Sequence, residues 1–94
     1  MDDQTRGDIE HTIDEILDRS LAFDPDIEWV FELSPVSSKL DFLLGFTLGR
    51  IYAQAWQVML SKNKDSDQDF HELEEIIKRR LPDIRSKITF GLNR

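Results

Sequence analysis

The sequence of 94 residues contains no cysteine and only four glycines. The lack of cysteine excludes disulfide bonds, thiolate catalysis and the zinc sites that use cysteine ligands. The few glycines do not have the spacing of a phosphate-binding loop, and no nucleophile elbow or Ser/His/Asp set can be assembled. These absences favour a protein without catalytic activity and without a cofactor.

The sequence also lacks a long uncharged apolar run. Its start, Met1-Asp2-Asp3-Gln4, is acidic and lacks the apolar core of a secretory signal. The longest uncharged apolar stretches, residues 42–49 and 51–61, are separated by Arg50, whereas a membrane-spanning helix needs about 20 apolar residues. We therefore expect no membrane role and a cytoplasmic location.

Basic residues are scarce in the first third of the chain. Residues 1–34 contain 11 acidic and 2 basic residues, and the whole chain has a net charge of −7. Residues 78–94 contain six basic residues and one acidic residue. The two ends should therefore attract each other, within one chain or between two. The acidic N-terminal face is the expected docking site for a basic protein partner. Nucleic-acid binding is not expected, because a surface that is acidic overall opposes binding to phosphates.

The spacing of the apolar residues predicts one all-α domain over residues 1–94, a bundle of four to five helices. We expect a disordered tail over residues 1–7 and a first helix over about 8–22. A long central helix should follow over about 35–62, opened by Ser34-Pro35. A further helix should run over 69–80 and begin with Asp69 as its cap.

Two segments are ambiguous between helix and strand. The alternation of apolar residues over 27–33 fits a short strand, but Asp24-Pro25-Asp26 before it is typical of a helix start, and we favour the helix. Pro82 and Gly91 bracket a last short helix, although an edge strand over 84–92 is the alternative.

The central helix carries the most information. At 100° per residue, its polar side chains form one narrow stripe and its apolar arc covers roughly 240°, against roughly 100° for an ordinary surface helix. Gly45 and Gly49 lie within that arc, and each costs about 1 kcal/mol relative to alanine in a helix. Small residues in one row let a second helix approach closely, although room for a bulky side chain of the same chain is the alternative.

The apolar surface of this helix exceeds what the other predicted helices can cover. Large exposed apolar patches usually mark association sites, so we predict a homodimer with the central helices near its core. The predicted interface residues are Phe42, Gly45, Phe46, Gly49, Tyr52, Ala53, Trp56 and Leu60.

Two histidine–glutamate pairs are candidate metal ligands. His11 with Glu15, and His71 with Glu75, place a histidine and a carboxylate on one helix face each, as a metal site shared by two helices would need. In so acidic a sequence such pairs are also expected by chance. A small metal-dependent all-helical enzyme is therefore an alternative function.

A second alternative is a DNA-associated regulator. The region 79–94 could form a small helix-turn-helix that presents Arg85 and Lys87. Its connection at Leu81-Pro82 is shorter than the usual turn, and the acidic remainder of the chain would repel DNA.

The function that we predict ahead of both alternatives is a non-catalytic protein–protein interaction or regulatory module that acts as a helical homodimer.

Overall fold

The computed structural model describes residues 1–24, 27–33 and 35–93, and these residues are almost entirely helical. No strand occurs in this part of the chain, so the prediction of an all-α fold is confirmed. The elements in chain order are α1 (Asp3–Asp18), the 3-10 turn η1 (Leu21–Phe23), α2 (Glu28–Leu33), α3 (Lys39–Ser61) and α4 (Asp67–Leu92).

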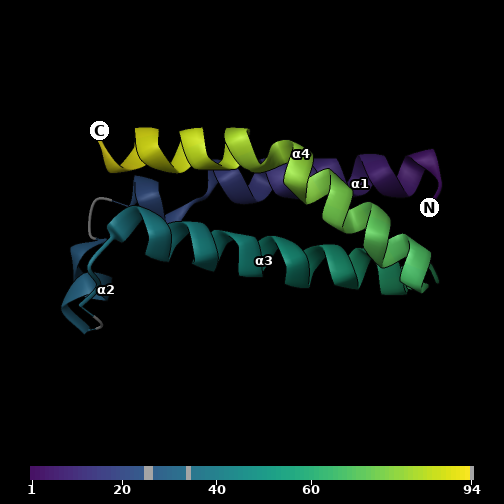
Figure 1. The fold of residues 1–94 in the computed structure, drawn as a ribbon, viewed down its shortest axis with the longest axis horizontal. Helices are drawn as coiled ribbons and strands as arrows, with labels where there is room; N and C mark the ends of the chain where they lie inside the picture. The colour runs from purple at the N-terminus through teal and green to yellow at the C-terminus, as the bar shows by residue number, and fades with distance from the viewer. Residues whose placement is uncertain (25–26, 34, 94) are drawn as a thin grey trace.

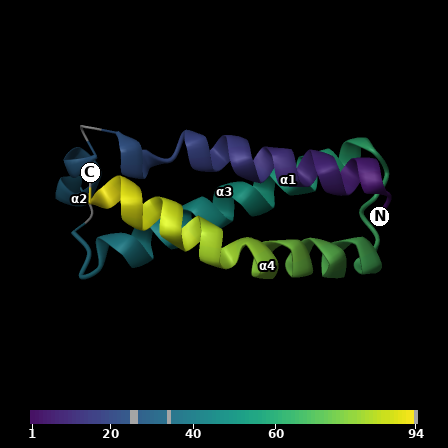
Figure 2. The same cartoon turned by 90° about the horizontal axis from the view of Figure 1, so that it is seen from above.

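The three long helices lie along one another in an elongated bundle. Figures 1 and 2 show α1 and α4 running in the same direction, while α3 runs the opposite way along both. The short helix α2 lies at the end of the bundle where α3 begins (Figure 1). The bundle measures 41 × 22 × 18 Å, so its length is close to that of its helices.

The core forms where the apolar rows of the three long helices meet. In α3 the buried row falls every four residues, and the corresponding rows of α1 and α4 face it. Each fully buried aliphatic side chain stabilises the fold by about 1.5–3 kcal/mol. The large apolar side chains with no exposed surface are Ile9 and Ile13 of α1, Leu43, Ile51 and Met59 of α3, and Leu73, Ile84 and Ile88 of α4.

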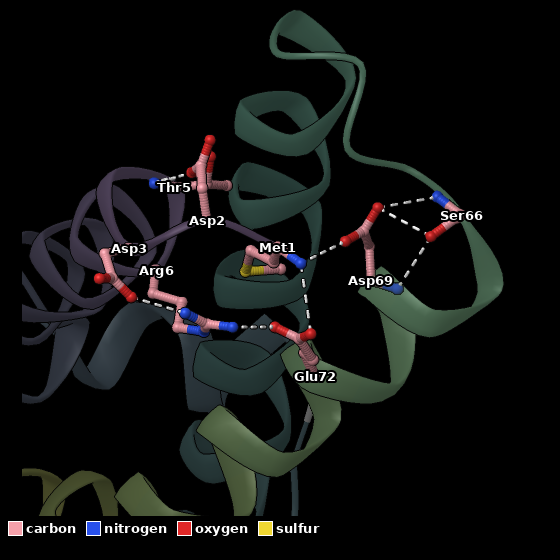
Figure 3. Close-up of polar contacts among 8 residues, drawn as sticks. All are labelled: Met1, Asp2, Asp3, Thr5, Arg6, Ser66, Asp69 and Glu72. Atoms are coloured by element: carbon pink, nitrogen blue, oxygen red, sulfur yellow. Dashed lines mark hydrogen bonds and ion pairs between the residues drawn. The ribbon is translucent and has the colours of Figure 1, made fainter.

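The N-terminal residues are helical from Asp3, so the predicted disordered tail over 1–7 and the predicted helix start at Asp8 are both wrong. Helix α1 begins at Asp3, because the side chain of Asp2 accepts a hydrogen bond from the backbone N–H of Thr5 and caps the helix. The amino group of Met1 lies 3.1 Å from Asp69 and 3.2 Å from Glu72 of α4 (Figure 3). The first residues are thus held against the distant start of α4.

The first helix also ends earlier than predicted. Helix α1 stops at Asp18, and the chain then makes the 3-10 turn η1, where the Ser20 hydroxyl accepts a hydrogen bond from the backbone N–H of Ala22. The preference for a helix over 27–33 is confirmed by α2. Pro25 and Asp26, part of its predicted start signal, lie outside the described residues.

Helix α3 begins at Lys39, four residues after the predicted start at Pro35. Ser38 is its N-cap, since the Ser38 hydroxyl accepts a hydrogen bond from the backbone N–H of Asp41. Ser34, the predicted cap, lies outside the described residues. The predicted end at Lys62 is close, because α3 ends at Ser61 and Lys62 is its C-cap.

The C-terminal third is one helix, which corrects the prediction of two helices over 69–80 and after Pro82. Pro82 lies inside α4, where it removes a backbone hydrogen bond and bends the helix (Figure 1). The cap is Ser66, and Asp69 completes a capping box three residues later instead of capping the helix itself. The alternative strand over 84–92 is wrong, because these residues are helical.

Candidate protein-interaction surface

One face of α3 is left uncovered by the rest of the bundle, and we call it the open face of α3. Four of its side chains are large and apolar, yet the exposed fractions are 43% for Phe46, 41% for Tyr52, 44% for Trp56 and 49% for Leu60. The open face consists of the eight predicted interface residues, of which Phe42 is half-buried and the others are exposed: Phe42, Gly45, Phe46, Gly49, Tyr52, Ala53, Trp56 and Leu60.

The open face exists because the core uses only part of the apolar circumference of α3. At 100° per residue the eight residues fall within an arc of roughly 120°, while the buried row from Leu43 to Met59 lies on the other side of the helix. One chain therefore covers one side of α3 and leaves an apolar surface on the other. The four exposed side chains extend over three to four turns, from Phe46 to Leu60, which makes the surface continuous along the helix.

Among the described residues, nothing packs against the two glycines of the open face. A Cβ atom built at Gly45 or at Gly49 would meet no atom within 4 Å. The alternative that these glycines make room for a bulky side chain of the same chain therefore has no support. Each still lowers helix stability by about 1 kcal/mol relative to alanine, and no packing contact among the described residues offsets this cost.

Aromatic clusters flank the glycines at both ends of the open face. Towards the start of α3, the ring of Phe42 lies 5.9 Å from that of Phe31 and 6.5 Å from that of Phe46. Towards its end, the ring of Phe70 lies 5.7 Å from that of Trp56 and 6.4 Å from that of Tyr52. Such ring pairs help to hold the exposed aromatic side chains in place.

Phe31 and Phe70, which are not among the predicted residues, pack against the rings of the open face. They belong to other elements, α2 and α4, and the apolar spacing assigns Phe70 to the apolar face of its own helix. Phe31 is buried and Phe70 half-buried beside the rings of α3. No signal within α3 identifies them, because their role depends on how the helices pack.

The acidic residues of α1 are largely engaged within the chain. Asp14 accepts a hydrogen bond from Arg80, Glu10 lies 3.4 Å from the same guanidinium, and Asp18 lies 3.5 Å from Lys87. The attraction predicted between the acidic and basic ends is thus met inside one molecule, where α1 and α4 lie side by side (Figure 2). An acidic N-terminal docking face has correspondingly less free charge to offer than a count of residues implies.

The predicted metal-ligand pairs remain separate. On α1, His11 Nε2 lies 2.7 Å from Glu15 Oε1. On α4, His71 Nδ1 lies 3.9 Å from Glu74 Oε2, so that the carboxylate beside His71 is Glu74 in place of the predicted Glu75. All these side chains are exposed. Within residues 1–24, 27–33 and 35–93, no group of three or more His, Asp or Glu side chains is arranged to hold a metal ion.

The predicted helix-turn-helix does not form in the C-terminal region. Residues 79–92 belong to the single helix α4, which passes through Pro82 without a turn. Arg80 is only 15% exposed and bound to carboxylates, so it does not join Arg85 in one exposed basic patch. Of the described helices, none combines the length and apolar character needed to cross a bilayer.

Comparisons with known proteins find no relative of this chain. No family model matches the sequence, and searches of curated proteins and of solved structures return no match.

Proposed function

We propose that this chain is a non-catalytic protein–protein interaction module that acts as a homodimer through the open face of α3. The observation that carries the proposal is the exposure of Phe46, Tyr52, Trp56 and Leu60 in one continuous stripe on a helix whose opposite side forms the core. Covering apolar surface contributes about 25 cal/mol for each Å² removed from water. A stripe of this kind is the surface that a partner protein would cover.

Aromatic content and rigidity both support binding at this surface. Tyrosine, tryptophan and phenylalanine are enriched at the centres of protein interfaces, and they carry a large part of the binding energy where they are well packed. Charged residues are absent from the eight positions of the open face, while Lys39, Asp41 and Arg50 of α3 lie beside them. An apolar centre with charged residues at its rim is the common composition of a protein interface.

The open face is small for a protein interface. From Phe42 to Leu60 the open face extends roughly 27 Å at 1.5 Å per residue. One helix face with its flanking rings lies at the low end of the range of stable interfaces, which bury about 800 Å² per partner. We therefore expect a dimer that forms in the micromolar range and dissociates on dilution.

Sedimentation velocity over a concentration series, from low micromolar to near-millimolar, tests the proposal. The wild-type chain should shift from monomer to dimer across the series. Phe46→Glu places a charge in the middle of the open face and should weaken the dimer by about thirtyfold or more, the effect of losing a hot-spot side chain.

Phe90→Glu is the matched control. Phe90 is 64% exposed on α4 and lies outside the open face, so this substitution adds the same charge at an equally apolar position. It should leave the dimer unchanged, and circular dichroism should show both variants folded. A wild-type chain that stays monomeric throughout the series, or equal weakening by the two variants, would overturn the proposal.

A further inference from the structure

On the open face of α3, residues at equal distances before and after Gly49 are of similar type. Three positions away on either side stand the aromatic residues Phe46 and Tyr52, and four positions away stand the small residues Gly45 and Ala53. Seven positions away the pattern closes with the aromatic residues Phe42 and Trp56. We call this arrangement the mirror pattern of α3. None of its positions is a core residue, because each is exposed except Phe42, which is half-buried.

A mirror pattern has a specific consequence for two identical helices. In a twofold interface the same patch serves both subunits, so that if residue i contacts residue j of the partner, then j contacts i. In an antiparallel pair, residues equally far from the crossing point on opposite sides stand across from each other. We propose that two copies of this chain pair through antiparallel α3 helices that cross at Gly49, an inference that rests on the proposed function.

This register places like residues in the same layer. Phe46 faces the partner's Tyr52, and Phe42 faces the partner's Trp56, so aromatic side chains meet aromatic side chains. Between them, Gly45 faces the partner's Ala53, and the two Gly49 residues meet at the twofold axis. The small residues permit the close approach of the two backbones, which gives the exposed helix glycines the packing role that their own chain does not supply.

The antiparallel orientation also spaces the helices evenly. Each end of the pair contains one phenylalanine and one tryptophan, so the layers at both ends have the same volume. A parallel pair would place two phenylalanines at one end and two tryptophans at the other, which would force the helices apart at the tryptophan end. Because interiors are close-packed, such unequal layers leave gaps or strain.

The charges near the ends of α3 favour the same orientation. Residues 28–41, around its start, contain three acidic residues and one lysine, whereas residues 57–67, around its end, contain two lysines and two aspartates. A parallel pair would bring the two acidic ends together, which opposes association. The antiparallel pair keeps the two acidic starts of α3 apart and also opposes the helix dipoles favourably.

Engineered cysteines test the register directly, since the natural chain has none. A disulfide needs Cα atoms within about 7 Å. Gly49→Cys should therefore form a covalent dimer on mild oxidation, across the twofold axis. Gly45→Cys alone should not, because the antiparallel register separates the two copies of position 45 by roughly 12 Å along the helix. A mixture of Gly45→Cys and Ala53→Cys should form the crosslinked heterodimer.

Gly7→Cys is the matched control for random collision. Gly7 is an exposed helix glycine on α1, and a Cβ atom added there would meet nothing within 4 Å, as at Gly45 and Gly49. All four variants replace small exposed helix residues and should fold like the wild type by circular dichroism. Their crosslinking yields, read on non-reducing gels, should then differ only through the dimer geometry.

The possible outcomes separate the register from the proposed function. Crosslinking of Gly49→Cys and of the Gly45→Cys/Ala53→Cys mixture, above the Gly7→Cys background, supports the antiparallel pair. Efficient self-crosslinking of Gly45→Cys indicates a parallel pair and overturns the register while leaving a dimer through α3 intact. Crosslinking at the background level for every variant, in a chain that sediments as a dimer, overturns pairing through this face, and a chain that sediments as a monomer overturns the proposed function itself.

Discussion

Gly91 of α4 packs directly against Ala22 of η1. A Cβ atom at Gly91 would lie 2.8 Å from the Cβ of Ala22 and 3.0 Å from its backbone carbonyl group. Both residues are buried, and this contact holds the C-terminal end of α4 on the turn that follows α1. Gly91 was predicted to stand just beyond the end of a helix, but it lies inside α4 because a close approach, and not a helix end, requires its small size.

Gly91→Ala should lower the free energy of unfolding by about 1–2 kcal/mol. The added methyl group meets backbone atoms and a Cβ that cannot rotate away, and overpacking of this kind outweighs the gain in helix propensity. Gly7→Ala is the control, because a methyl group there meets open space and should raise stability by up to about 1 kcal/mol. Urea unfolding followed by circular dichroism measures both changes, and equal stabilisation by the two substitutions would contradict the close contact.

Arg80→Met should destabilise the fold by about 1–2 kcal/mol, whereas Arg79→Met should cost less than about 0.5 kcal/mol. The Arg80 side chain is 15% exposed and lies between Glu10, Asp14 and Asp83, while that of Arg79 is 66% exposed and lies 3.7 Å from Glu10. Removing Arg80 leaves the buried Oε1 atom of Glu10 without its counter-charge. The urea midpoints of the two variants test the difference, and equal midpoints would show that Arg80 acts only as a surface charge.

The helical class was predictable because it depends on the period of the apolar residues. Rows such as Ile9 and Ile13, or Ile84 and Ile88, recur every four residues and fix which side of each helix is buried. The sequence also placed all eight residues of the open face within the apolar arc of α3. It could not show which part of that arc the bundle covers, since the choice depends on where α1 and α4 dock.

The predicted boundaries failed where a distant contact or a local cap decided them. Pro82 is a common sign of a new helix, yet α4 continues through it because Ile84 and Ile88 beyond it remain in the core. The residues before Asp8 have no apolar period that would predict order. Their helix forms because Asp2 caps it and because Met1 reaches Asp69, a contact between residues 68 positions apart that no local pattern reveals.

Acetylation of the Met1 amino group should destabilise the chain at neutral pH, and the effect should fade in alkali. Its hydrogen bonds to Asp69, which has the larger effect, and to Glu72 raise the pKa of this amino group above its ordinary value of 8.0. A group whose pKa is raised by folding contributes stability that is fully present below pH 8.0 and is lost as the pH rises through the folded-state value. Urea midpoints of the free and acetylated chains should therefore converge between neutral and strongly alkaline pH, and a constant difference would contradict the ion pair.

Asp69→Asn tests the same contact from the acid side. Two hydrogen bonds lower the pKa of Asp69 below its ordinary value of 3.8 (Figure 3). The hydrogen bond from the Ser66 hydroxyl has the larger effect, and that from the Met1 amino group has the smaller one. A carboxylate whose pKa is lowered by folding contributes stability that is present above pH 3.8 and is lost as the pH falls from there through the folded-state value. The asparagine keeps one oxygen for the capping box but cannot hold the negative charge beside Met1.

The stability of Asp69→Asn should thus fall below that of the wild type at neutral pH, and the difference should shrink as the solution is acidified. Asp65→Asn, in the exposed loop before α4, makes the same change in net charge and serves as the control for it. Chemical unfolding of the three chains between pH 7 and pH 2 measures the convergence. If Asp69→Asn instead kept its full deficit in acid, the lost stability would come from capping geometry alone, and the charge on Asp69 would have no part in fastening the N-terminus to α4.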